Sequence, residues 1–227
     1  MRTMSLYQTY LYQQYQKAGD TVRKFAGKII LRIVPNISPN QITLSSFVTG
    51  IIAAWLVAKG YWILGAVVYY ISDVLDGIDG YVARETNKNS AYGAYLDSTL
   101  DRYIDVLMIS AVVYSYVNQQ VLPSYWIIIL GIAILGVLLP SYTTHRAESL
   151  EKVALQFPIP FGRRIRMHLL VLGLVLGKPE YIIILFGIIG NMNIVWRLRP
   201  QTLTTYARLS KPEKESLPKT TIRKYTK

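Results

Sequence analysis

The chain has 227 residues, of which 52% are hydrophobic, and its mean hydropathy is +0.26. This composition is too apolar for an ordinary soluble domain and is typical of a small polytopic membrane protein. The absence of cysteine excludes disulfides, thiol catalysis and cysteine-ligated metals, and two histidines, His145 and His168, are too few for a histidine metal site. We see no signal peptide, no internal repeat and no second globular domain.

The first predicted element is an amphipathic helix over residues 20–34. Asp20 or Thr21 can cap its start, and Pro35 follows its end. Apolar positions keep helical spacing on one face, and basic residues stand four apart on another. These positions are Val22, Phe25, Ala26, Ile29, Ile30 and Ile33, against Lys24, Lys28 and Arg32. We expect the helix to lie on the cytoplasmic membrane surface, with a soluble packing helix as the alternative.

Six apolar runs follow, most of them long enough to cross a bilayer as helices. They are residues 43–59, 61–83, 96–117, 125–143, 164–177 and 181–196. We therefore predict an all-α, polytopic membrane protein with six transmembrane helices after the surface helix. Its domains are an N-terminal arm over residues 1–19, a membrane domain over residues 20–200, and a flexible basic tail over residues 201–227.

The net charge of +12 is distributed unevenly over the predicted connections. Of the 25 Lys and Arg residues, 22 lie in the N-terminal region, the second and fourth connections and the tail. Only Lys59 and Lys178 lie in the other connections, and Arg102 lies within an acidic region. The positive-inside rule then places both termini and that region on the cytoplasmic side of the cell membrane. The charge orients the protein and favours anionic membrane lipid, so it predicts no nucleic-acid partner.

The acidic region covers the end of the second run and the start of the third, and it holds six aspartates. They are Asp73, Asp76, Asp79, Asp97, Asp101 and Asp105. Ionisable groups within membrane-type segments are costly and therefore point to function. Spacings of three from Asp76 to Asp79 and of four from Asp97 to Asp105 place the side chains of each set on one helix face. Two facing acidic surfaces are suited to holding divalent cations through oxygen ligands.

The segment from Asp76 to Asp101 follows the pattern D-x-x-D-G-x-x-A-R-x8-G-x3-D-x3-D. It resembles the signature of the CDP-alcohol phosphotransferase family, with every specified position filled. Such enzymes move a phosphate-linked group from a CDP-activated alcohol, usually a CDP-linked lipid, to a second alcohol and release CMP. The resemblance implies an integral-membrane transferase of phospholipid biosynthesis that uses Mg²⁺ or Mn²⁺, as two ions, and forms a homodimer.

The resemblance also implies roles for particular residues. The implied metal ligands are Asp76, Asp79, Asp97 and Asp101, with Asp101 also the general base that takes the proton from the acceptor hydroxyl. The implied nucleotide-binding residues are Asn40, Thr43, Asp73, Asp76, Gly80, Ala83, Arg84 and Gly93. The small residues Gly80, Ala83 and Gly93 keep the helix surface low where a nucleotide must approach. Arg84 can pair with a phosphate or with a carboxylate of the site.

Several neighbouring residues allow two interpretations. Asn40 can cap the helix of the first span, contact the nucleotide phosphates, or do both. Asp73 can line the nucleotide pocket or form a hydrogen bond within the core, and Gly77 can be a packing glycine or a nucleotide contact. Asp105 is expected to be structural and paired with Arg102 three residues before it. Arg102 can alternatively contact the acceptor.

The fourth connection carries the evidence on the acceptor. Its first eight residues, Ser141 to Glu148, resemble the S-Y-x-R-A-R-A-E stretch of prokaryotic inositol-phosphate-using members, with Thr144 and His145 as departures. Because guanidinium groups fit phosphate oxygens, we predict that arginines here bind a phosphorylated acceptor, inositol phosphate. The predicted acceptor-binding residues are Arg146, Arg163, Arg164 and Arg166. The alternatives are that these charges serve only orientation, that the acceptor is glycerol phosphate or serine, or that the donor is CDP-inositol.

Two other classes of protein agree less well with the sequence. Intramembrane prenyltransferases also use aspartates with Mg²⁺, but the D-G-x-x-A-R segment is not theirs. A divalent-cation transporter needs acids or polar groups that continue toward the other membrane face. Here the spans become apolar before Asp73 and beyond Asp105, so the acidic pocket is open on one side only.

Overall fold

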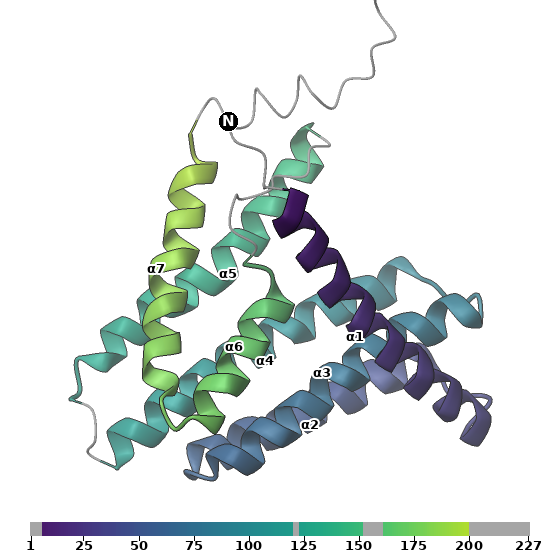
Figure 1. Cartoon of the computed structure of the whole chain (residues 1–227), viewed down its shortest axis with the longest axis horizontal. Helices are drawn as coiled ribbons and strands as arrows, with labels where there is room; N and C mark the ends of the chain where they lie inside the picture. Colours follow the sequence, from purple (N-terminus) through teal and green to yellow (C-terminus); the bar gives the residue numbers. More distant parts are fainter. Residues whose placement is uncertain (1–5, 120–122, 152–160, 200–227) are drawn as a thin grey trace, which may run out of the picture.

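The computed structural model describes residues 6–119, 123–151 and 161–199, and within them the chain is entirely helical (Figure 1). The helices are α1 (Leu6–Ile33), α2 (Pro39–Ala58), α3 (Trp62–Glu85), α4 (Ala91–Asn118), α5 (Trp126–Glu151), α6 (Arg163–Val175) and α7 (Pro179–Arg197). This confirms the predicted all-α class. The predicted basic tail over residues 201–227 lies outside the described residues.

Helices α2 to α7 correspond one by one to the six predicted spans. Within the described residues, α2, α5 and α7 are long and apolar enough to cross a membrane. Helices α3 and α4 carry the acidic residues, and α6 has 13 residues. At 1.5 Å per residue α6 is about 20 Å long, shorter than a hydrocarbon core of about 30 Å. The protein is therefore a multi-pass membrane protein with three clearly apolar membrane-length helices.

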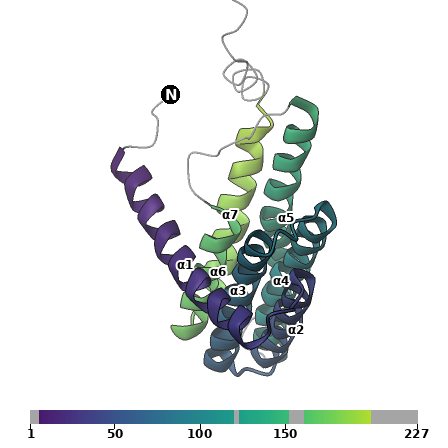
Figure 2. The ribbon, with the colours of Figure 1, turned by 90° about the vertical axis from the view of Figure 1, so that its right-hand side faces the viewer.

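Helix α1 begins at Leu6, so the prediction that Asp20 or Thr21 caps it is wrong. The chain between Leu6 and Ile33 contains no proline, and the glycines at 19 and 27 do not interrupt the helix. Figure 1 and Figure 2 show α1 on the outside of the bundle, crossing α3.

The apolar residues of α1 divide between two surroundings. Ala26, Ile30 and Leu31 pack against a cluster formed by α2 and α3, which contains Ile42, Ile78, Tyr81 and Val82. Val22, Phe25, Ile29 and Ile33 are exposed. One side of α1 is thus held by the bundle, and a second apolar stripe is left on the outer surface.

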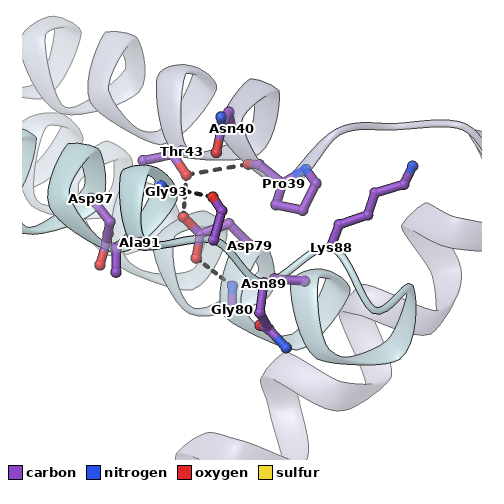
Figure 3. Close-up of a pocket in the computed structure, with 13 residues that line it drawn as sticks. Pro39, Asn40, Thr43, Asp79, Gly80, Lys88, Asn89, Ala91, Gly93 and Asp97 are labelled. Atoms are coloured by element: carbon purple, nitrogen blue, oxygen red, sulfur yellow. Dashed lines mark hydrogen bonds between the residues drawn. The ribbon is translucent and has the colours of Figure 1, made fainter.

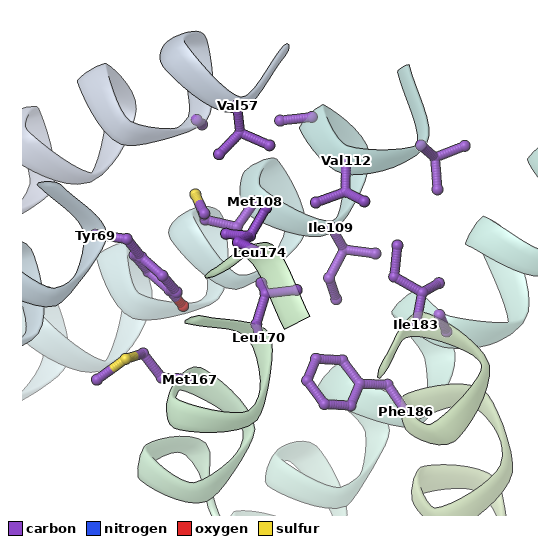
Figure 4. Packing of buried hydrophobic residues seen from close by; sticks show 14 of the residues in the cluster. Val57, Tyr69, Met108, Ile109, Val112, Met167, Leu170, Leu174, Ile183 and Phe186 are labelled. Carbon is purple, nitrogen blue, oxygen red and sulfur yellow. The ribbon is translucent and has the colours of Figure 1, made fainter. Parts of the chain in front are cut away.

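The remaining helices form two close pairs, α2 with α3 and α5 with α7, which α4 and α6 join. The main core lies between these pairs (Figure 4) and includes Val57, Met108, Val112, Leu170 and Ile183. Helices α5 and α7 approach closely at Gly136 and Gly190. A Cβ on either glycine would collide with the backbone of the other helix, so the close approach requires glycine at both positions.

The outer faces of the bundle are also apolar. On α2, for example, Leu44, Val48, Ile51 and Trp55 are all about half exposed or more. Soluble monomers rarely expose contiguous apolar surfaces of this kind, whereas a helix that contacts lipid does. The distribution of exposed residues therefore agrees with a membrane environment.

Candidate active site

The aspartates of the motif, Asp76, Asp79, Asp97 and Asp101, occupy the C-terminal half of α3 and the N-terminal half of α4, which a short turn joins. Carboxylate oxygens of Asp76, Asp97 and Asp101 lie within 4.8 Å of one another. The Oδ1 atom of Asp97 is buried and has no hydrogen-bond partner in the described part of the chain. A buried carboxylate oxygen without a partner is costly, and a cation at this position would satisfy it. A donor set made of carboxylate oxygens alone fits a hard divalent cation such as Mg²⁺ or Mn²⁺.

Asp79 faces a different neighbour, helix α2. Its Oδ2 atom accepts a short hydrogen bond from the Thr43 hydroxyl, which also lies 3.2 Å from the carbonyl oxygen of Pro39. Its Oδ1 atom accepts a hydrogen bond from the backbone N–H of Gly80 (Figure 3). Asp79 is therefore outside the closest group of three carboxylates, and it links that group to the start of α2.

A pocket of about 420 Å³ opens beside Asp79 and Asp97, between the starts of α2 and α4 and the end of α3 (Figure 3). Five of the eight predicted nucleotide-binding residues line it: Asn40, Thr43, Gly80, Ala83 and Gly93. A Cβ on Gly80 would meet no atom closer than 3.4 Å, the Nη1 atom of Arg84. The surface above Gly80 is thus open, and the guanidinium of Arg84 lies at its edge.

The sequence did not predict the rest of the pocket wall. It comes largely from the turn between α3 and α4 and from the first turn of α4: Lys88, Asn89, Ser90, Ala91 and Ala94. Their place in the sequence could have indicated this, because a polar connection between two acidic helices must pass close to the site. Lys88 adds a cation to a wall that otherwise carries two aspartates.

The start of α2 is organised differently from the prediction. Ser38 occupies the position before the helix, and its backbone N–H donates to Gln41 Oε1 at 2.9 Å. Pro39 follows at the first helical position, where its missing N–H costs nothing. Asn40 lies inside the helix, so its prediction as a cap is wrong. Asn40 lines the pocket, and its contact with the nucleotide phosphates stays a prediction.

Asp73 is held within the core. Its Oδ2 atom accepts a hydrogen bond from Arg23 Nη2 of α1 at 2.9 Å, and both side chains are buried. The guanidinium of Arg23 reaches Asp73 by lying directly across Gly77, where a Cβ would overlap it. This confirms the core hydrogen bond of Asp73 and shows Gly77 as a packing glycine. Asp73 does not line the 420 Å³ pocket.

The Arg23–Asp73 contact leads to a prediction about stability. Gly77→Ala should displace Arg23 and leave Asp73 buried without its partner, at a cost of about 3 kcal/mol in unfolding free energy. Thermal unfolding of the purified protein in detergent measures this. Gly19→Ala, on α1 where nothing lies within 4 Å of the added carbon, is the matched control and should be neutral or slightly stabilising. Equal stability of Gly77→Ala and the parent would show that the pair contributes nothing.

Two arginines of α6 reach the acidic residues from the side opposite α2. Arg163 donates to Asp76 Oδ2 at 2.8 Å, its Nη2 lies 2.7 Å from Asp101 Oδ1, and its Nε lies 3.7 Å from Asp105 Oδ1. Arg166 is buried and donates to Asp105 Oδ2 at 3.0 Å and to the carbonyl oxygen of Phe161 at 3.1 Å. The Arg163–Asp76 and Arg166–Asp105 contacts each join residues more than 60 positions apart in the sequence.

The expected pair between Arg102 and Asp105 is wrong. Arg102 Nη1 lies 3.6 Å from Asp101 Oδ2 and donates to the backbone carbonyl of Ser98 at 3.0 Å. Asp105 faces the bundle interior instead, where Arg166 pairs with it. The prediction considered only neighbours on the same helix, whereas the buried face of α4 meets α6.

The other two predicted acceptor-binding arginines lie farther out. Arg146 is exposed near the end of α5, and Arg164 is half-buried in the first turn of α6. Between them and the core, Arg197 of α7 donates to the carbonyl oxygen of Pro140 at 3.2 Å and to the hydroxyl of Thr144. Arg197 thereby holds the segment of α5 that leads to Arg146.

The fold and the site together define a multi-pass membrane protein with a carboxylate cluster beside an open pocket. The family model for CDP-alcohol phosphatidyltransferases matches residues 36–196, and the chain belongs to this family. It therefore falls in the family that the motif resembled.

Named relatives are similar in sequence to part of this chain. It is 31% identical over 183 residues to a bifunctional IPC transferase and DIPP synthase of Aquifex aeolicus, covering 76% of this chain and 41% of that protein. The same name belongs to a Thermococcus kodakarensis protein that is 34% identical over 124 residues, covering 55% of this chain and 28% of the relative. An archaetidylinositol phosphate synthase of Methanothermobacter thermautotrophicus is 38% identical over 88 residues, 39% of this chain and 44% of the relative. The chain thus spans less than half the length of these relatives.

Solved structures share the fold. A phosphatidylinositol phosphate synthase of Mycobacterium tuberculosis with CDP-DAG bound superposes with a TM-score of 0.70, at 20% identity, over 84% of this chain and 97% of that one. The same enzyme in complex with manganese and citrate also gives a TM-score of 0.70, with 20% identity, over 84% of this chain and 92% of that one.

Proposed function

We propose that this protein transfers a substituted phosphate group from a CDP-activated alcohol to a second alcohol and releases CMP, as a step of phospholipid synthesis. One observation carries the proposal: the carboxylates of Asp76, Asp97 and Asp101 converge beside the pocket, with an Asp97 oxygen left without a partner. Membership of the CDP-alcohol phosphatidyltransferase family supports the same reaction.

The aspartates are proposed to hold two divalent ions, Mg²⁺ or Mn²⁺. Asp76, Asp97 and Asp101 form the close group, and Asp79 extends it toward α2. When bound, such ions neutralise charge on the pyrophosphate of the donor. The hydrogen bond from Thr43 to Asp79 orients this carboxylate.

The pocket is proposed to take the cytidine nucleotide of the donor. Asn40, Thr43 and Lys88 supply polar and cationic groups along one side, and Gly80, Ala83 and Gly93 keep the helix surfaces low. A Cβ on Gly93 would lie 3.1 Å from the Asn40 side-chain oxygen, so a larger residue would crowd this side of the pocket. Arg84, at the edge above Gly80, is placed to pair with a phosphate. Asp73 is proposed to contribute to nucleotide binding only indirectly, through its ion pair with Arg23.

Asp101 is proposed as the general base. It belongs to the close group of carboxylates, and its Oδ1 atom lies 2.7 Å from Arg163 Nη2 of α6. In the reaction the acceptor hydroxyl oxygen forms a bond to the phosphorus that carries the donor's alcohol group. The bond from this phosphorus to the bridging oxygen of the pyrophosphate breaks, CMP leaves with that oxygen, and Asp101 takes the hydroxyl proton.

The acceptor is proposed to enter from the α6 side, opposite the nucleotide pocket, and to carry a phosphate. Arg163, Arg164 and Arg146 are the proposed phosphate contacts. Arg166 was predicted to join them, but its buried pair with Asp105 gives it a positioning role instead. Inositol phosphate is the proposed acceptor, since relatives of this chain are named archaetidylinositol phosphate synthase and IPC transferase and DIPP synthase. The latter name also supports CDP-inositol as a donor.

The proposed setting is the cell membrane. Helices α2 to α7 form six spans, with both termini and the acidic site on the cytoplasmic side, and the exposed apolar stripe of α1 lies on the membrane surface. Residues 20–200 form the membrane domain. The family resemblance supports a homodimer.

The test is to incubate the purified protein with a CDP-linked lipid or CDP-inositol, Mg²⁺ or Mn²⁺, and a panel of acceptors, and to measure CMP. We expect CMP release that depends on inositol phosphate. Release with glycerol phosphate or serine would replace the proposed acceptor and keep the reaction class. Divalent-ion transport across vesicles without any CMP release would favour the transporter alternative.

Arg164→Ala should raise the KM for a phosphorylated acceptor far more than the KM for the CDP-linked donor. A hydrogen bond to a charged group contributes about 1.5–3 kcal/mol, or about ten- to a hundredfold in binding. Steady-state kinetics with each substrate varied in turn measure the two constants. Arg32→Ala, which removes an exposed cation of α1, should change neither KM. An unchanged acceptor KM in Arg164→Ala would leave this arginine as a charge that only orients the protein.

A further inference from the structure

Arg163 occupies the acidic cluster as an internal cation. It is the first residue of α6 and follows Gly162, which precedes the helix. Its two terminal nitrogens contact Asp76 Oδ2 and Asp101 Oδ1, two of the three carboxylates of the close group. The side chain is 22% exposed, so one part of it can still reach solvent.

A divalent ion in the same cluster needs the same oxygens. The ion proposed at Asp76, Asp97 and Asp101 would lie next to the guanidinium, and two cations at such short range repel strongly in a partly buried site. Among the buried side-chain oxygens of the described residues, Asp97 Oδ1 is the one without a hydrogen-bond partner. Ion binding and the Arg163 contacts therefore compete for Asp76 and Asp101.

Not every nitrogen of the Arg163 guanidinium forms a hydrogen bond, so the side chain is able to move. Its buried Nε atom has no hydrogen-bond partner within the described residues and lies 3.7 Å from Asp105 Oδ1, too far for a hydrogen bond. Arg166 pairs with Asp105 more closely, at 3.0 Å. The contacts to Asp76 and Asp101 thus provide most of what keeps the guanidinium in place.

We propose that Arg163 is a displaceable counter-ion: a divalent ion expels its guanidinium from Asp76 and Asp101, and the freed guanidinium then binds the acceptor phosphate. This inference rests on the proposed metal and acceptor roles of the site. It makes the ion and the phosphate bind cooperatively through one side chain, and the coupling is reciprocal. The acceptor phosphate is then held tightly only after the ion has bound.

Mn²⁺ binding to the purified protein in detergent, followed by electron paramagnetic resonance without nucleotide, tests the competition. Arg163→Met should bind Mn²⁺ about ten- to a hundredfold more tightly than the parent, because charge-assisted contacts no longer compete. Arg163→Lys keeps the charge but not the two-pronged contact, so its affinity should lie between the two. Arg32→Met, which removes the same charge from an exposed position of α1, is the matched control and should remain within about threefold of the parent.

Sulfate, as a phosphate analogue that leaves Mn²⁺ in solution, tests the coupling. It should tighten Mn²⁺ binding by the parent and by Arg32→Met, and have no effect on Arg163→Met. Mn²⁺ affinity in Arg163→Met and Arg163→Lys that equals or falls below that of the parent would overturn the competition. If parent and variants all failed to bind Mn²⁺, the proposed metal site would be wrong, and the inference with it.

Discussion

Asp97→Asn is expected to abolish CMP release while the protein stays folded in detergent. The carboxylate of Asp97 belongs to the close group with Asp76 and Asp101, and one of its oxygens is buried without a partner. An amide has nearly the same volume but brings no charge, so the variant loses a cation ligand without a packing defect. We expect turnover to fall by at least about a thousandfold, of the order seen when a principal electrostatic group is removed from an active site.

Glu85→Gln is the matched control for this variant. It removes a carboxylate from the exposed end of α3, outside the cluster, and should keep parental turnover. Mn²⁺ binding by Asp97→Asn should weaken in parallel with activity. Substantial turnover by Asp97→Asn at saturating Mg²⁺ would remove Asp97 from the set of metal ligands.

Gly80→Leu is expected to block CDP binding and to leave Mn²⁺ binding nearly unchanged. A Cβ on Gly80 points into open space, with Arg84 as its nearest neighbour, and Gly80 lines the 420 Å³ pocket. A leucine side chain would fill the volume in which the nucleotide is proposed to lie. Calorimetric titration with CDP should therefore show at least about a hundredfold loss of affinity, as expected when steric overlap removes several contacts at once.

Gly131→Leu on α5 controls for the general effect of a leucine on an open helix surface. Gly131 has no atom within 4 Å of an added Cβ, and it is exposed and far from the pocket in sequence. It should bind CDP as the parent does. Native CDP affinity in Gly80→Leu would show that the nucleotide does not approach this part of α3.

The elements that the sequence predicted well are those with a strong local pattern. Apolar runs bounded by charge or by proline predicted six helices whose limits agree with the structure to within two residues, except at the starts of α2 and α4 and at the end of α5. Helix spacing placed Asp97 and Asp101 on one face, and the structure brings them together with Asp76. The pattern needed only the geometry of one helix at a time.

The start of α1 and the cap of α2 were predicted incorrectly, because local signals competed. Asp20 and Thr21 are good capping residues, but the preceding residues continue the helix and leave no end to cap. At α2, Ser38, Pro39 and Asn40 are all compatible with a helix start. The structure selects Ser38, whose backbone N–H pairs with Gln41.

Contacts between distant segments could not be predicted from spacing. Arg23 reaches Asp73 over Gly77, and Arg166 reaches Asp105, because α1 and α6 pack against α3 and α4 in three dimensions. One sequence feature did point toward the first of them: a glycine beside an aspartate on an apolar helix permits the close approach of a long side chain. Which arginine would use the space required the fold.

In the proposed reaction an acceptor hydroxyl attacks the phosphorus bearing the donor's alcohol group. An isotope experiment tests this step: the acceptor carries ¹⁸O in its reacting hydroxyl, the CDP-linked donor and Mn²⁺ are added, and both products are analysed by mass spectrometry. We expect the new phosphodiester to carry the ¹⁸O, CMP to be unlabelled, and the two products to form in equal amounts. Label in CMP would contradict the proposed reaction. So would release of CMP without any labelled phosphodiester, with oxygen from water in the other product.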